Sequence, residues 1–187
     1  MLTLHPKCFT RYKFFNSLFL GVSVGSIFTL YAPLEPSIYS FGGILLAIGM
    51  LVVSRVYLHI LNAYWFFRIS LFVEIVLFIA IVYFLLNQYS YTTALTMYIG
   101  YQVTFVFGSY LVRAETLLLK TDALLTKLDT AKQLGYLSGM AISYLFYKLI
   151  NIQGITKNQE QVYLIHYLLM GIECVVIVLI IKSFQRR

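Results

Sequence analysis

Six apolar stretches, each about as long as a bilayer is thick, follow one another along this chain of 187 residues. A membrane-spanning helix takes about 20 residues, so six of them leave room only for short connections. With 60% apolar and 11% charged residues, a water-soluble fold would have too few charges to cover its surface. The sequence therefore predicts an all-α, polytopic membrane protein forming a single transmembrane domain over residues 1–187. The predicted spans are 14–34, 38–61, 66–87, 92–113, 133–151 and 162–181.

Residues 114–132 interrupt this pattern, because they carry both acidic and basic side chains. Leucines recur among these charges at helical spacing, which is typical of a helix lying on a membrane surface. The sequence predicts a cytoplasmic amphipathic helix here, between the fourth and fifth spans.

Lysine and arginine gather on one side of the predicted topology. Twelve fall on the side of both termini and two on the other, and cytoplasmic loops carry the excess of these residues. This predicts that both termini are cytoplasmic. The protein is expected to lie in the cell's inner or plasma membrane, with the lipid bilayer as a partner. The same residues account for the net charge of +7, so no nucleic-acid partner is expected. The twelve are Lys7, Arg11, Lys13, Arg55, Arg68, Arg113, Lys120, Lys127, Lys132, Lys182, Arg186 and Arg187; the two are Lys148 and Lys157.

Motifs that carry enzyme chemistry are absent from the sequence. Its cysteines and histidines do not have metal-ligand spacing, and no glycine-rich phosphate-binding motif or nucleophile motif occurs. We expect no enzymatic activity, no cofactor and no metal.

Small residues recur every four positions in two of the predicted spans. In lipid, such stripes let helix backbones approach closely. They indicate helix packing in the first and fifth spans, either as static contacts or as a moving interface. The stripes are Ser17, Gly21 and Gly25 in the first span, and Gly135, Gly139 and Ser143 in the fifth.

Ionisable residues inside the predicted spans are costly in lipid, so each needs a partner, a cavity or a role. Arg55 and Glu74 lie at similar predicted depth, which predicts a buried ion pair. Glu173 lies near the midplane of the sixth span without a cation at its depth, and His166 precedes it by two helical turns. Glu173 is then either a neutral, hydrogen-bonded acid or a proton or cation site.

Three polar side chains in the fourth span, Tyr98, Tyr101 and Gln102, need partners in apolar surroundings. They are candidates for lining a polar cavity. Tyr98 and Gln102, together with Glu173 and His166, form the predicted set for substrate or ion handling.

The topology resembles one six-helix half of a major facilitator superfamily transporter. The similarity is strongest over 108–143, where family members carry a glycine start, an acidic residue late in the fourth helix, a Leu-Leu pair, an Asp and a basic entry to the fifth helix. The matching residues here are Gly108, Glu115, Leu117-Leu118, Asp122 and Lys132 to Gly135. The family's signature between the second and third helices is altered, since Asn62 replaces its Asp, Trp65 replaces a Gly and only Arg68 is basic.

The resemblance implies a second half, because the family's solute site lies between two halves at the midplane. A two-fold homodimer is the simplest way to supply it. We therefore expect a half-size transporter-like protein that moves a small solute, with the proton as a candidate coupling ion. Two alternatives remain: a non-transporting scaffold or accessory subunit of another membrane protein, and a substrate-capture subunit of a multi-part importer.

Overall fold

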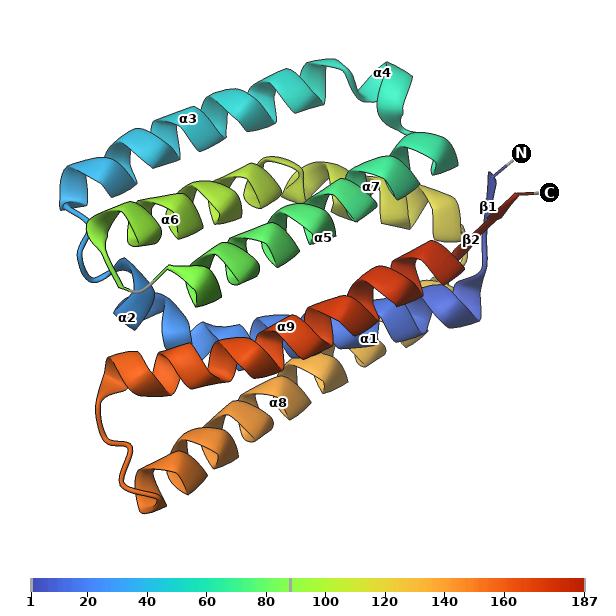
Figure 1. Cartoon of the computed structure of the whole chain (residues 1–187). Coiled ribbons are helices and arrows are strands. Elements are labelled where there is room, and N and C mark those ends of the chain that lie inside the picture. Colours follow the sequence, from blue (N-terminus) through green and yellow to red (C-terminus); the bar gives the residue numbers. More distant parts are fainter. Residues whose placement is uncertain (1, 88, 187) are drawn as a thin grey trace.

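A computed structural model describes residues 2–87 and 89–186 and is built almost entirely of helices (Figure 1). A short 3-10 turn, Val24–Ser26, joins the first two helices, and two short strands lie at the chain ends. The helices are α1 (Pro6–Ser23), α2 (Ile27–Tyr31), α3 (Pro36–Arg55), α4 (Tyr57–Ile60), α5 (Ala63–Leu86), α6 (Tyr91–Val106), α7 (Gly108–Leu119), α8 (Asp122–Ile152) and α9 (Asn158–Lys182).

Local sequence signals place several helix starts. Pro6 and Pro36 occupy the first turns of α1 and α3, where a missing backbone N–H costs no helical hydrogen bond. Asn62 caps α5 by accepting a hydrogen bond from the backbone N–H of Trp65 at 3.1 Å. Ser90 caps α6 in the same way, through the N–H of Thr93 at 3.1 Å.

Five helical segments in the described chain are long and apolar enough to cross a membrane, which makes this a multi-pass membrane protein. Helix α8 is longer still at 31 residues, but its first turns are charged and it does not belong to that set. The five are Pro6–Tyr31, Pro36–Arg55, Ala63–Leu86, Tyr91–Leu119 and Asn158–Lys182.

The predicted surface helix over 114–132 is not formed as one element. Helix α7 ends at Leu119, because Lys120 adopts a left-handed backbone conformation with φ of 55° that breaks the helix. Helix α8 then begins at Asp122 and continues without interruption to Ile152. Leu128 is buried and Leu118, Leu124 and Leu125 pack against the core, so most of the leucine periodicity reflects packing within the bundle, whereas Leu117 is exposed.

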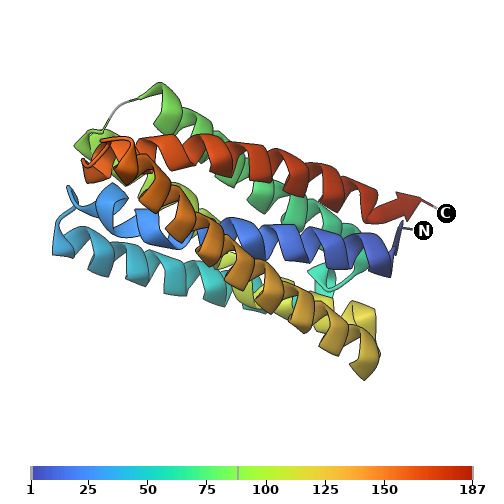
Figure 2. The same ribbon diagram turned by 90° about the horizontal axis from the view of Figure 1, so that it is seen from below.

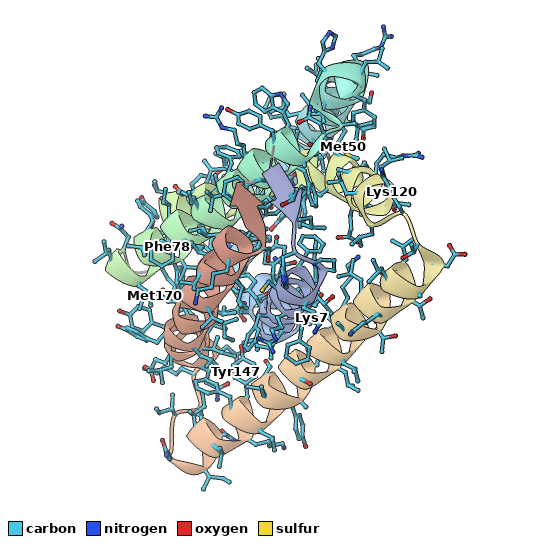
Figure 3. The ribbon with its side chains drawn as sticks, turned by 90° about the vertical axis from the view of Figure 1, so that its right-hand side faces the viewer. Lys7, Met50, Phe78, Lys120, Tyr147 and Met170 are labelled. Atoms are coloured by element: carbon cyan, nitrogen blue, oxygen red, sulfur yellow. The ribbon has the colours of Figure 1, made fainter. Side chains whose placement is uncertain are left out.

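The long helices lie side by side in the spatial order α8, α1, α9, α5, α6, α3 (Figure 1). Helices α3 and α8 form the two edges. Seen end-on, α1 occupies the centre, with Lys7 between α9 and α8 (Figure 3). The first helix of the chain is therefore surrounded by helices made much later.

The closest helix pair is α1 with α8, which cross obliquely (Figure 2). The two predicted small-residue stripes meet here: Gly21 lies against the backbone of Tyr136 and Gly139, and Gly139 against the backbone of Leu18. Gly25 faces Ser143 and Tyr147 in the next turns. Backbones this close leave no room for larger side chains, which explains why small residues recur.

The chain ends lie next to each other. Strand β1 (Leu2–Leu4) pairs in antiparallel fashion with β2 (Phe184–Arg186), and the backbone N–H of His5 donates to the carbonyl of Ser183 at 2.8 Å. Phe184 packs against Phe9, Phe66 and Phe67, which anchors the strand pair to α1 and α5. Both termini consequently lie at one end of the bundle (Figures 1 and 2).

Candidate functional site

Two glutamates meet inside the bundle. Glu74 lies near the middle of α5 and Glu173 near the middle of α9, and these helices are packed side by side. Glu74 is 1% exposed and Glu173 is 0% exposed. Their carboxyl groups interact electrostatically and lie within reach of a hydrogen bond that requires one of them to be protonated. We call Glu74 and Glu173 the carboxyl pair.

Helix α1 supplies the donors for one member of this pair. The hydroxyl of Tyr12 donates to Oε1 of Glu74 at 2.5 Å, and Nδ2 of Asn16 donates to the same oxygen at 3.0 Å. Residues four apart lie on one face of a helix, so a single turn of α1 provides both donors. Both hydrogen bonds favour the ionised form of Glu74, because hydrogen bonds to a carboxylate are stronger than those between neutral groups.

Among the described residues, the other three oxygens of the carboxyl pair have no hydrogen-bond partner when both groups are ionised. They are Oε2 of Glu74 and both carboxyl oxygens of Glu173. Two buried carboxylates repel each other, and neither can donate a hydrogen bond. A proton bound between them would remove the repulsion and supply the missing donor. The arrangement can therefore take up and give back a proton.

A second charged group, which we call the lysine clasp, lies at the terminal end of the bundle. Oε2 of Glu115 on α7 forms an ion pair with Nζ of Lys13 on α1 at 2.9 Å, and Oε1 of Glu115 contacts Lys132 on α8. Lys132 also pairs with the exposed Asp129 at 3.2 Å. The side chain of Glu115 is only 5% exposed, so this clasp ties three helices together.

The titration of Lys132 reflects these contacts. Burial alone would lower the pKa of Lys132, but the hydrogen bonds and negative charges of Glu115 and Asp129 outweigh it and raise that pKa above its usual value. Lys132 therefore remains a cation at all physiological pH values.

The expected ion pair between Arg55 and Glu74 is absent from the described part of the chain. Arg55 ends α3 at an edge of the bundle and is exposed. Glu74 faces α1 and α9 on the opposite side of α5 and binds Tyr12 and Asn16. The pairing was predicted from similar depth, and depth does not determine which face of a helix a side chain occupies.

His166 is fully buried on α9, on the same helix as Glu173 and about 10 Å away along its axis. Its Nδ1 is hydrogen-bonded to the carbonyl oxygen of Val162 at 2.6 Å, and its ring packs against that of Phe84 in a tilted arrangement with a centroid separation of 4.2 Å. Nε2 has no partner among the described residues. His166 does not touch the carboxyl pair, so the two predicted ion-handling residues belong to different layers of the bundle.

Tyr98 and Gln102 lie away from the carboxyl pair. They line a groove of about 420 Å³ between α3 and α6, and Tyr98 donates to the carbonyl of Tyr39 at 3.3 Å. Apolar side chains of α3 and α6 form most of this groove. The polar cavity expected around these two residues is therefore an apolar groove. The residue of α6 that does interact with Glu173 is Tyr101.

Three residues of the site lie before or at the edge of the predicted first span: Tyr12, Lys13 and Asn16. The first span was predicted to begin at residue 14, whereas α1 begins at Pro6. The spacing of Tyr12 and Asn16 on one helical face was the signal that could have identified them.

No family model matches the chain, and neither a curated protein nor a solved structure matches it. Within the described residues, no group of three or more His, Cys, Asp or Glu side chains is placed to hold a metal ion.

Proposed function

We propose that the protein is a six-span membrane transporter that couples the movement of a small solute to a proton bound by the carboxyl pair. The observation that carries this proposal is the contact between Glu74 and Glu173, three of whose carboxyl oxygens have no partner in the part of the chain that the structure describes. Buried ionisable groups at bilayer depth are costly and typically belong to ion or substrate pathways.

The donors around Glu74 favour a proton over a metal ion. Tyr12 and Asn16 direct hydrogens at Glu74, which suits a carboxylate whose neighbour is a protonated acid. A metal cation would be served by oxygen lone pairs converging from several sides. We assign the negative charge to Glu74 and the exchangeable proton to Glu173, which has no donor of its own in the described structure.

Pairing of the chain ends supports an even number of crossings, since it holds both termini at one end of the bundle. Counting α8 as a sixth crossing satisfies this requirement. The sequence-based excess of lysines and arginines on the side of the termini, twelve against two, favours a cytoplasmic location for that end. The membrane would then be the inner or plasma membrane.

The homodimer in this proposal follows from the resemblance to one half of a larger transporter. A solute path between two halves needs a second bundle, and a second copy with the same orientation would supply it. Helix α3 forms an edge of the bundle and exposes apolar side chains such as Phe41, Ile48 and Leu51. A partner or lipid must cover this face.

Proton flux through reconstituted protein tests the proposal. The purified chain is placed in liposomes that contain a pH-sensitive dye, a potassium diffusion potential is imposed, and panels of sugars, amino acids and organic ions are added outside. We expect solute-dependent acidification that Glu173→Gln abolishes. Glu160→Gln is the matched control, because Glu160 lies on the same helix but is exposed beside Lys157.

Absence of any solute-dependent flux, or flux unchanged in Glu173→Gln, would contradict the proposal. Stoichiometry in detergent then separates the alternatives. A homodimer fits the transporter, a stable complex with a different membrane protein fits the scaffold, and a monomer that binds solute tightly fits the capture subunit.

A further inference from the structure

One turn of α1 connects the carboxyl pair to the lysine clasp. Tyr12 and Asn16 reach Glu74 from this turn, and Lys13 lies between them in sequence and reaches Glu115. Lys13 also interacts electrostatically with Glu74, although it is bonded to Glu115. A single ammonium group thus has two carboxylates within electrostatic range and is bonded to one of them.

Lys13 can leave the lysine clasp without leaving the charge of Glu115 unpaired. Glu115 contacts two lysines, so if Lys13 leaves, Lys132 still neutralises it. Glu74, by contrast, has neutral donors but no cation bonded to it among the described residues. The surplus positive charge therefore lies within electrostatic range of Glu74, and the carboxyl pair gains a second negative charge when Glu173 loses its proton.

We propose that Lys13 is the exchangeable countercharge of the carboxyl pair, moving from Glu115 to Glu74 when the pair releases its proton. This inference rests on the proposed function and assigns a residue that competes with the transported ion. When Glu173 is protonated, the pair carries one negative charge and Lys13 stays with Glu115. When the O–H bond of Glu173 breaks, the proton leaves to water at the terminal end, and the ammonium of Lys13 offsets the second negative charge.

Other ionisable groups around the pair do not offer the same compensation. They are Tyr12 on α1, Tyr101 on α6, Glu115 on α7 and Cys174 on α9, and each is neutral or negative. Lys13 is the one cation found to interact with Glu74 in the described structure. Proton release and the loosening of α1 from α7 would accordingly occur together.

Infrared titration of the purified protein measures the protonation of the pair directly. The carbonyl band of a protonated carboxyl group that disappears in Glu173→Gln is followed against pH, and its midpoint is recorded. We expect Lys13→Met to raise this midpoint by at least about one pH unit, a tenfold change in proton affinity. Lys13→Arg should stay close to the unmodified protein. Lys7→Met is the matched control, since Lys7 is exposed on the same helix.

A double-mutant cycle distinguishes movement of Lys13 from a static electrostatic effect of the surrounding charges on the carboxyl pair. Glu115→Gln frees Lys13 to approach Glu74. On its own it should lower the midpoint, but it should leave the midpoint unchanged when Lys13 is already replaced by Met. An equal shift in both backgrounds would overturn the proposal, because a static charge acts regardless of Lys13. An unchanged midpoint in Lys13→Met would overturn it too. If no band depends on Glu173 at all, the proposed function itself fails.

Discussion

Gly135 on α8 lies directly against the backbone carbonyl of Phe14 on α1, so a methyl group at position 135 would overlap that carbonyl. The two glycines of α8, at 135 and 139, hold α1 at backbone contact distance over two turns. This contact positions the turn of α1 that carries Tyr12, Lys13 and Asn16. The small-residue stripe thus contributes to the site without touching it.

Replacing this glycine should separate the two helices. We expect Gly135→Ala to destabilise the protein by about 1–3 kcal/mol, because the obstacle is backbone and cannot rotate away. Gly43→Ala on α3 is the matched control, because nothing lies within 4 Å of the added methyl group. Thermal unfolding in detergent compares the two variants. Equal melting temperatures would show that α1 and α8 are not packed this closely.

The hydrogen bond from Tyr12 to Glu74 should contribute more to the stability of the protein than the side chain of Arg55 does. Tyr12→Phe removes one donor from the buried Glu74 and should cost about 1.5–3 kcal/mol. That cost should shrink in the Glu74→Gln background, where the acceptor is no longer charged. Arg55→Ala should change stability by less than about 0.5 kcal/mol, since Arg55 is exposed. A large loss of stability in Arg55→Ala would instead support an ion pair between Arg55 and Glu74.

Membrane topology can be read from single cysteines in a background carrying Cys8→Ser and Cys174→Ser. We expect Lys157→Cys to react with an impermeant thiol reagent from outside intact cells. Lys127→Cys should react only after the cells are opened, since α8 begins at the end of the bundle where the termini lie. Labelling of both positions from the same side would mean that α8 does not cross the membrane.

The contribution of Lys132 to stability should be independent of pH across the neutral range. Its pKa is raised in the folded protein, so its stabilising effect is complete below the unfolded value of about 10.4 and is lost only as pH rises through the folded value. Chemical denaturation of the unmodified protein and of Lys132→Met, compared between about pH 6 and about pH 11, measures this contribution to stability. A difference between them that disappears near neutral pH would contradict the assignment.

Length and apolarity were sufficient to predict the helices. Each predicted span overlaps a helix of the structure, because an apolar run of this length has few other solutions in lipid. The break at Lys120 was not predicted, since a left-handed residue outside glycine leaves no mark in hydrophobic periodicity. The small-residue stripes were recognised as packing surfaces, but the sequence did not indicate that the two stripes pack against each other.

The partner of Glu173 could not be read from the sequence for a similar reason. Helix α5 is apolar on all sides, so its sequence does not say which face Glu74 occupies. Depth alone then favoured Arg55, a residue of opposite charge, over Glu173, a residue of like charge. Pairing like charges makes sense only if a proton is shared, which is a property of the assembled bundle.

The central position of α1 has a consequence for biogenesis. Gly21 and Gly139 touch in the finished protein, yet 118 residues separate them in the chain. At about 5–20 residues per second, α1 waits roughly 6–24 s after its synthesis before α8 emerges. During that interval its glycine stripe faces lipid or any passing helix. The last two helices to be made, α8 and α9, then complete the interior around the first.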